Sequence, residues 1–205
     1  MKGHADGQRA TRPYRQSARA TAAERTRASI LDATVTLVLE KATAQVSLAD
    51  VAERAGVSVQ TILRHFQTRE GMLDAALQYG TAAIRDERRA PAGDLPSALH
   101  ALFDHYERRG DAVIRLLAQE SFDSRIAQVT SSGREVHRTW VRQLVDGLGL
   151  RDDDELIDQL VVATDVYTWK LLRRDRGLSR RVTEQRVGEM VRILLQHRSR
   201  EEEQT

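Results

Sequence analysis

The 205-residue sequence contains no cysteine, only three prolines and no long apolar run. Without cysteine the chain has no disulfide framework, no thiolate metal site and no cysteine nucleophile. No run approaches the roughly 20 apolar residues of a membrane-spanning helix, and the polar N-terminal region lacks the apolar stretch of a signal peptide. We therefore expect a cytoplasmic protein without a membrane segment.

Signatures of catalysis are also missing from the sequence. The six histidines, at positions 4, 65, 100, 105, 137 and 197, show no HExxH or paired-ligand spacing, and no glycine-rich phosphate loop is present. The acidic run at residues 152–155 stands at a predicted helix start, where carboxylates stabilise the positive end of the helix dipole. We expect no enzymatic activity, no metal and no cofactor.

Charge is abundant, with 32 basic and 30 acidic residues beside 40% hydrophobic ones, as in soluble globular proteins. Residues 1–69 carry 11 Lys and Arg against 6 Asp and Glu, a balance of +5, whereas the remainder has −3. Residues 1–20 show no apolar periodicity and are expected to form a disordered basic arm. Such an arm is typical of a protein that binds a polyanion, although a solvated tail explains it equally well.

Start signals for four helices follow this arm. Thr21, Ser47, Ser58 and Thr68 each precede a helical pattern, and the first two have an acidic residue three positions later, as in a capping box. Gly56 ends the second helix, because glycine adopts the left-handed conformation at little cost. The predicted helices begin near residues 21, 47, 58 and 68, and the last runs towards a break at residues 91–93.

Helical periodicity continues after that break, so an all-α fold is expected. The pattern predicts helices at residues 95–109, 111–120, 132–148, 154–174 and 182–196, with a turn or short helix near residues 122–129. Three of these helices are expected to stop at glycines 110, 149 and 177. Residues 199–205 are expected to be a frayed tail.

Two short helices joined by a glycine turn, as at residues 47–66, describe a helix-turn-helix whose second helix enters the DNA major groove. Val59, Gln60 and Arg64 are expected to face outward and contact thymine, adenine and guanine edges, respectively. An ordinary capped helical hairpin with a solvated Arg64 is the alternative. The predicted DNA-binding residues, including those that hold phosphates, are Ser47, Ser58, Val59, Gln60, Thr61, Arg64, His65 and Arg69, with Arg15 and Arg19 from the arm.

The run VSLADVAERAGVSVQTILRHFQTREGML, from Val46 to Leu73, resembles the N-terminal signature of the TetR family of bacterial transcriptional repressors. The preceding ERTRASILDATVTLV is similar to that family's first helix. The resemblance implies a three-helix DNA-binding domain, expected at residues 21–68, and a larger helical domain for effector binding and dimerisation, expected at residues 69–198. Leu63 replaces the tyrosine usual in the family, which predicts the loss of one phosphate contact.

The resemblance also implies a homodimer, and a two-fold dimer predicts a palindromic operator. Apolar stripes on the last two predicted helices supply the expected interface, although an ordinary intramolecular core explains these stripes as well. The interface residues predicted from them are Leu156, Leu160, Ala163, Tyr167, Leu171, Val187, Met190, Val191 and Leu194.

For a small-molecule pocket, the aromatic and imidazole residues of the second domain are the candidates, although packing is their default role. Trp140, with His137 and Leu144 on one helix face, is the preferred wall, and Arg115 or Glu120 the preferred charged anchor. The predicted pocket residues are Phe103, Tyr106, Arg115, Glu120, His137, Trp140 and Tyr167.

The sequence thus predicts a ligand-responsive transcriptional regulator that binds double-stranded operator DNA as a homodimer. Repression, and release by an unknown small-molecule effector, follow from the family resemblance. The alternative is a helical regulator that acts through protein partners without binding DNA, which the departure at Leu63 favours slightly.

Overall fold

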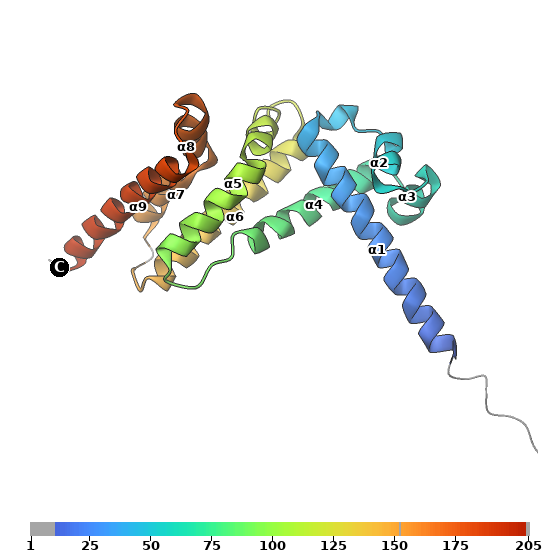
Figure 1. The fold of residues 1–205 in the computed structure, drawn as a ribbon, viewed down its shortest axis with the longest axis horizontal. Helices are drawn as coiled ribbons and strands as arrows, with labels where there is room; N and C mark the ends of the chain where they lie inside the picture. The colour runs from blue at the N-terminus through green and yellow to red at the C-terminus, as the bar shows by residue number, and fades with distance from the viewer. Residues whose placement is uncertain (1–10, 152, 204–205) are drawn as a thin grey trace, which may run out of the picture. The chain divides into compact units, whose positions relative to one another are not determined.

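The computed structural model describes residues 11–151 and 153–203 (Figure 1). Every regular element in this part of the chain is helical, which confirms the expected all-α fold. The described residues form two compact units, an N-terminal unit that reaches Leu77 and a C-terminal unit that begins at Gln78. None of the described helices is long and apolar enough to cross a membrane.

The N-terminal unit contains α1 (Thr11–Glu40), a 3-10 turn (Thr43–Gln45), α2 (Leu48–Ala55), α3 (Val59–Phe66) and the first half of α4 (Arg69–Glu87). α2 packs against α1 and α3. Apolar residues from the later turns of α1, from α2 and α3 and from the first half of α4 are buried, so the unit has its own core. The core residues include Ile30, Leu31, Leu37, Val38, Val46, Val51, Ile62, Phe66, Met72 and Leu73.

The disordered arm predicted at residues 1–20 is wrong for residues 11–20, which form the first turns of α1. Residues 1–10 lie outside the described part of the chain. Arginine and alanine, which dominate residues 12–23, are good helix formers. Pro13 stands in the first turn, where a missing N–H costs no intrahelical hydrogen bond. The predicted start at Thr21 therefore lies inside a longer helix.

The C-terminal unit contains the end of α4, then α5 (Leu95–Leu117), α6 (Ser124–Gly147), α7 (Asp154–Thr164) and α8 (Val166–Lys170). A π-helical turn (Leu171–Asp175) follows α8, and α9 (Arg180–Glu203) completes the unit. α5 packs against α6, α8 and α9, so it is the central helix of this unit. The core includes Leu102, Phe103, Tyr106, Val141, Ile157, Leu160, Trp169, Val187 and Val191.

Gly110 does not end a helix as predicted, because α5 continues through it to Leu117. Its role is close packing: a Cβ at Gly110 would lie 2.5 Å from Cζ3 of Trp169. The helix predicted from residue 132 also begins earlier, at Ser124, where the Asp123 carboxylate accepts hydrogen bonds from the backbone N–H groups of Arg125 and Ile126. The two helices expected at residues 95–120 are therefore one helix, and so are those expected at 122–148.

The single helix predicted at residues 154–174 is broken at Asp165. This residue ends α7 in an extended conformation, and its carboxylate accepts a hydrogen bond of 2.8 Å from the backbone N–H of Tyr167 at the start of α8. The break leaves the Thr164 carbonyl free of a helical partner, and the buried Tyr106 hydroxyl donates to it over 2.9 Å. Asp165 therefore separates two helices that the apolar pattern joins.

Candidate nucleic-acid interface and ligand cavity

A capping box fixes the start of α2, as the sequence predicts. The backbone N–H of Asp50 donates to Ser47 Oγ over 3.1 Å, and the backbone N–H of Ser47 donates to Asp50 Oδ2 over 2.8 Å. Lys41 Nζ, beyond the end of α1, also donates to Asp50 Oδ2, at 2.9 Å. These hydrogen bonds, from Lys41 first and then Ser47, hold the pKa of Asp50 below its usual range. Ser47 is thus engaged in holding α2 to the end of α1.

The turn between α2 and α3 uses the predicted glycine. Gly56 has a φ of 66°, in the left-handed region, and the next N–H, of Val57, donates to the Ala52 carbonyl over 3.0 Å. Ser58 then caps α3 by accepting from the backbone N–H of Thr61 over 3.1 Å. The turn and the cap together set the direction in which α3 leaves α2.

α3 buries Ile62 and Phe66 and presents its opposite side to solvent. Val59 is 37% exposed, and Gln60 and Arg64 are exposed as well. Within the described residues the side chains of Gln60 and Arg64 form no hydrogen bond or ion pair. Thr61 and His65 are half-buried at the edges of this surface. The three predicted base-contacting residues therefore lie on one accessible face, which we call the recognition face (Val59, Gln60 and Arg64).

Two arginines that the sequence analysis did not single out hold α2 and α3 against α1. Arg54 of α2 donates to both carboxylate oxygens of Glu40, at 2.9 and 2.8 Å. The guanidinium of Arg27 lies over the Phe66 ring, 5.1 Å from its centroid, and so links α1 to α3. Arg19 lies exposed on α1, whereas the Arg15 side chain is outside the described residues.

Arg69, a predicted phosphate contact, makes several hydrogen bonds within the chain. Its Nε donates to the Val46 carbonyl over 2.7 Å, its Nη2 donates to the Thr43 carbonyl, and its Nη1 lies 3.3 Å from Glu70 Oε1. A guanidinium suits this task because its fixed fork reaches two carbonyls at once. The start of α4 is thereby attached to the segment that precedes α2, and three of the five N–H donors of Arg69 have partners within the chain.

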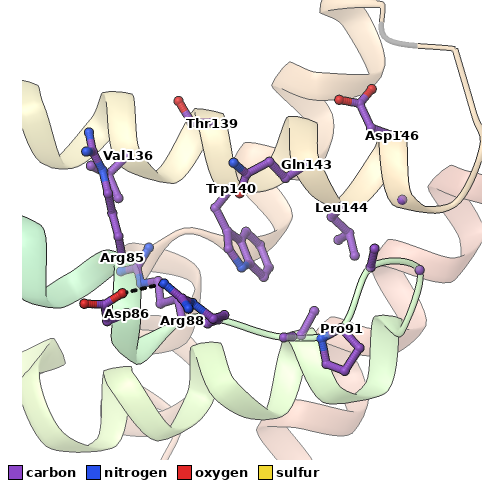
Figure 2. Close-up of a pocket in the computed structure, with 16 residues that line it drawn as sticks. Arg85, Asp86, Arg88, Pro91, Val136, Thr139, Trp140, Gln143, Leu144 and Asp146 are labelled. Atoms are coloured by element: carbon purple, nitrogen blue, oxygen red, sulfur yellow. Dashed lines mark hydrogen bonds and ion pairs between the residues drawn. The ribbon is translucent and has the colours of Figure 1, made fainter.

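In the C-terminal unit, a cavity of about 950 Å³ lies between α6, the end of α4 and the loop that leads to α5. Figure 2 shows the Trp140 indole reaching from α6 towards the loop that carries Pro91. Val136 and Leu144 flank Trp140 on the same helix and also line the cavity. The charged lining residues are Arg85, Asp86, Arg88, Arg89 and Asp146.

Of the predicted pocket residues, Trp140 lines this cavity, and His137 stacks behind it with ring centroids 5.7 Å apart. Phe103 and Tyr106 are buried in the core instead. The other predicted residues, Arg115, Glu120 and Tyr167, do not line this cavity.

Glu120 hydrogen-bonds Thr130 and Arg134, both over 2.7 Å, so it is not the predicted charged anchor of this cavity. Arg115 lies two residues before the end of α5, likewise outside the lining. Most of the charges that line the cavity come from the end of α4 and the two residues after it, which the sequence pattern did not bring near Trp140, whereas Asp146 belongs to α6.

Buried polar groups adjoin the cavity. Arg88 Nη1 lies 3.2 Å from His137 Nδ1, and His105 Nδ1 lies 2.7 Å from Glu87 Oε2. Burial first, and the charge of Arg88 second, lower the pKa of His137 to about 3 and that of His105 to about 4. Although burial opposes it, hydrogen bonds from Arg109 and His105 hold the pKa of Glu87 at about 2. Both imidazoles are therefore neutral at neutral pH.

Only part of the nine predicted interface residues is accessible at the surface of the chain. Five of them are buried in the core of their own unit, because the stripes of α7 and α9 face α5 and each other; these are Leu156, Leu160, Ala163, Val187 and Val191. Tyr167, Leu171 and Met190 are exposed, and Leu194 is half-buried. Val162, which broadens the stripe of its helix, is 67% exposed, and Ile193, which was not predicted, is 65% exposed.

Comparison with known proteins gives a family match for an N-terminal part of the chain and structural matches for most of it. Residues 30–76 match the family model described as bacterial regulatory proteins, tetR family. These residues run from the middle of α1 into α4 and include the whole helix-turn-helix. Comparison with curated protein sequences gives no significant match.

Several solved structures share the fold over most of the chain. A tetR-family transcriptional regulator from Streptomyces coelicolor superposes with a TM-score of 0.68 at 18% identity, covering 88% of this chain and 85% of that one. A transcriptional regulator from Rhodococcus sp. Rha1 gives 0.58 at 22% identity, with 85% and 96% covered. The flavonoid-responsive regulator FrrA gives 0.58 at 21% identity, with 85% and 97% covered.

At these identities the structural likeness establishes the fold, while the family match covers the helix-turn-helix built by the Ser47 and Ser58 caps and the Gly56 turn. Residues 30–76 of this chain therefore carry the N-terminal helix-turn-helix segment of the tetR family of bacterial regulatory proteins, and the chain shares its fold with solved tetR-family transcriptional regulators.

Proposed function

We propose that this regulator is a repressor that binds a palindromic operator as a homodimer and that a small-molecule effector releases it. The DNA-binding role belongs to residues 21–68 and the effector and dimerisation roles to helices within residues 69–198. The observation that carries the proposal is the recognition face of α3, whose exposed side chains have no partner within the described residues.

The side chains of the recognition face are chemically suited to contact base edges. Gln60 and Arg64 are four residues apart, so they lie next to each other on one side of α3. A glutamine pairs with adenine and an arginine with guanine in the major groove, each bidentate contact being worth about 1–3 kcal/mol of discrimination. The Val59 methyl groups suit a thymine methyl. Thr61 and His65, at the edges, are placed to hold phosphates.

Dimerisation is supported by the exposed apolar residues of the last helices, which we call the outer face (Val162, Tyr167, Leu171, Met190 and Ile193). α7 and α9, which carry three of them, pack side by side. Exposed apolar groups gathered on adjacent helices are typical of an interface, because water is displaced from them on association. Two helices from each subunit would form a four-helix bundle about a two-fold axis.

Effector binding is supported by the cavity beneath Trp140, whose volume of about 950 Å³ falls in the range of small-molecule sites. A protein of the same fold, FrrA, is a flavonoid-responsive regulator. Release then requires only that the effector binds more tightly to a conformation that does not fit the operator. A difference of about 1–3 kcal/mol in binding free energy is enough for partial induction.

Selection of binding sites from random DNA tests the proposal, followed by fluorescence anisotropy with the full chain. We expect a salt-sensitive, sequence-selective complex with two related half-sites. Gln60→Ala and Arg64→Ala should each relax the preference at one position of each half-site, whereas Arg151→Ala, an exposed arginine outside the helix-turn-helix, should not. Recovery of no selective site, even at low salt, would instead favour a regulator that acts through protein partners.

A further inference from the structure

Arg88 is a buried cation without a counter-ion in its own unit. It is only 8% exposed, and no carboxylate of the described residues lies within ion-pair distance of its guanidinium. Its neighbours in sequence are engaged elsewhere: Asp86 pairs with Arg89 at 2.8 Å, and Glu87 pairs with Arg109 at 2.6 Å. A buried charge is unfavourable unless it is paired, so an isolated guanidinium here calls for a partner that the protein itself does not supply.

The groups that hold Arg88 orient it without neutralising it. The Thr164 hydroxyl donates its hydrogen to the Leu160 carbonyl over 2.6 Å, so it accepts from His137 Nε2 at 3.1 Å. The neutral imidazole therefore has its lone pair at Nδ1, which accepts from Arg88 Nη1 at 3.2 Å. The guanidinium also lies over the Tyr106 ring, 5.3 Å from its centroid.

Arg88 Nε is buried and has no hydrogen-bond partner. The residue lines the cavity beneath Trp140, together with Val136 and Leu144. Of the two acids in the lining, Asp86 is paired with Arg89, and Asp146 lies beyond Trp140 and Leu144, as Figure 2 shows. The Arg88 end of the cavity therefore carries a buried cation without a carboxylate partner next to an apolar wall, and the exposed Arg85 adds a second positive charge to the lining.

We propose that the ligand of this cavity is an organic monocarboxylate with an apolar body, and that Arg88 binds its carboxylate. The inference rests on the proposed function in one respect, since it takes this cavity as the effector site. A carboxylate fits the guanidinium fork in a bidentate manner, and one negative charge balances the one buried cation of the lining, Arg88. The apolar body then packs against Trp140, Val136 and Leu144, and an aromatic or alkyl group suits this wall.

Direct binding to the full chain tests this, with benzoate, cinnamate and octanoate as probes and the corresponding amides as uncharged controls. Calorimetry and the quenching of tryptophan fluorescence, to which both Trp140 and Trp169 contribute, report binding without DNA. We expect at least one acid to bind at millimolar or lower concentration and to bind about tenfold or more tightly than its amide. The inference fails if none of the acids binds or if an amide binds as tightly as its acid.

Substitution of Arg88 identifies the anchor. Arg88→Gln should abolish the preference for acid over amide, whereas Arg89→Gln should keep it, because Arg89 is exposed and already paired with Asp86. Arg88→Lys keeps the charge and loses the fork, so it should bind the acid more weakly than the wild type and still prefer it to the amide. This second variant remains informative if Arg88→Gln does not fold. An undiminished preference for acid over amide in folded Arg88→Gln, or an undiminished affinity for the acid in Arg88→Lys, would overturn the assignment.

The two proposals fail in different ways. If an acid binds through Arg88 but never alters operator binding, the carboxylate site is confirmed and the proposal that this cavity is the effector site is wrong. If neutral compounds release the operator while the acids neither bind nor release it, the regulator stands and the carboxylate site falls.

Discussion

Trp169 of α8 rests on the backbone of α5 at Gly110, where the indole occupies the space that any side chain at this position would need. Gly110→Ala should therefore destabilise the C-terminal unit by about 1–3 kcal/mol through overpacking, although alanine is the better helix former. Urea denaturation followed by circular dichroism measures this. The matched control is Gly133→Ala in α6, where a Cβ meets no atom within 4 Å; it should stabilise by about 0.5–1 kcal/mol. Equal effects of the two substitutions would contradict the packing argument.

Arg69→Gln separates the structural role of Arg69 from a phosphate contact. Loss of the hydrogen bonds to the Val46 and Thr43 carbonyls should lower the free energy of unfolding by about 1.5–3 kcal/mol. The salt dependence of operator binding should keep its slope, because no phosphate contact is removed. A slope reduced by about 1 would restore the phosphate role that the sequence suggested.

Ile193→Glu should dissociate the proposed dimer and leave each subunit folded. A carboxylate placed in an apolar interface loses its water without gaining a partner, so the dimer dissociation constant should rise about a hundredfold or more. Sedimentation velocity measures the assembly, and the helical signal of circular dichroism checks the fold. Gln185→Glu, at an exposed polar position of the same helix, should leave the assembly unchanged. A wild-type protein that sediments as a monomer at all concentrations would refute the outer face as an interface.

Stability should fall as the pH is lowered from 6.5 to about 4. The pKa of His105 falls to about 4 and that of His137 to about 3, chiefly by burial, from the ordinary value of 6.5. Between these limits the unfolded chain binds protons that the folded protein does not, so protonation favours unfolding. The histidines contribute their full stability above pH 6.5.

His137→Gln, which keeps a hydrogen-bonding side chain beside Arg88 and Thr164, should reduce the pH dependence by up to about one proton. Chemical denaturation at several pH values between 4 and 7 measures the slope. A slope equal to that of the wild-type chain over the same pH range would contradict the role assigned to His137.

The helix-turn-helix was predictable because its signals are local. Ser47 and Asp50 form their capping box three residues apart, and Gly56 and Ser58 act on the adjacent backbone. No long-range information was needed to find the recognition face once the burial of Ile62 was inferred. The error at residues 11–20 has a related origin, since helix propensity alone extends α1 beyond the apolar pattern that marked its predicted start.

Features of the C-terminal unit that depend on distant contacts were missed. From the sequence alone Gly110 is interpreted as a helix end. No local signal shows that Trp169, distant in the sequence, packs against it. The stripe through Val187 and Val191 indicates one buried side of α9 but does not say whether the same chain or a partner covers it. Arg88 entered no prediction, because its burial depends on the loop at residues 91–93 bringing the end of α4 to α6.

The interruption at Asp165 has a consequence for the surface of the protein. By closing one helix and opening the next, this carboxylate turns Trp169 towards α5 and leaves Tyr167 and Leu171 facing water. In an uninterrupted helix these three side chains would follow the helical periodicity of α7. A different set of them would then be buried and a different set exposed. The composition of the outer face is therefore governed by an acidic residue that is not itself part of it, and sequence changes at Asp165 alter which groups a second subunit meets.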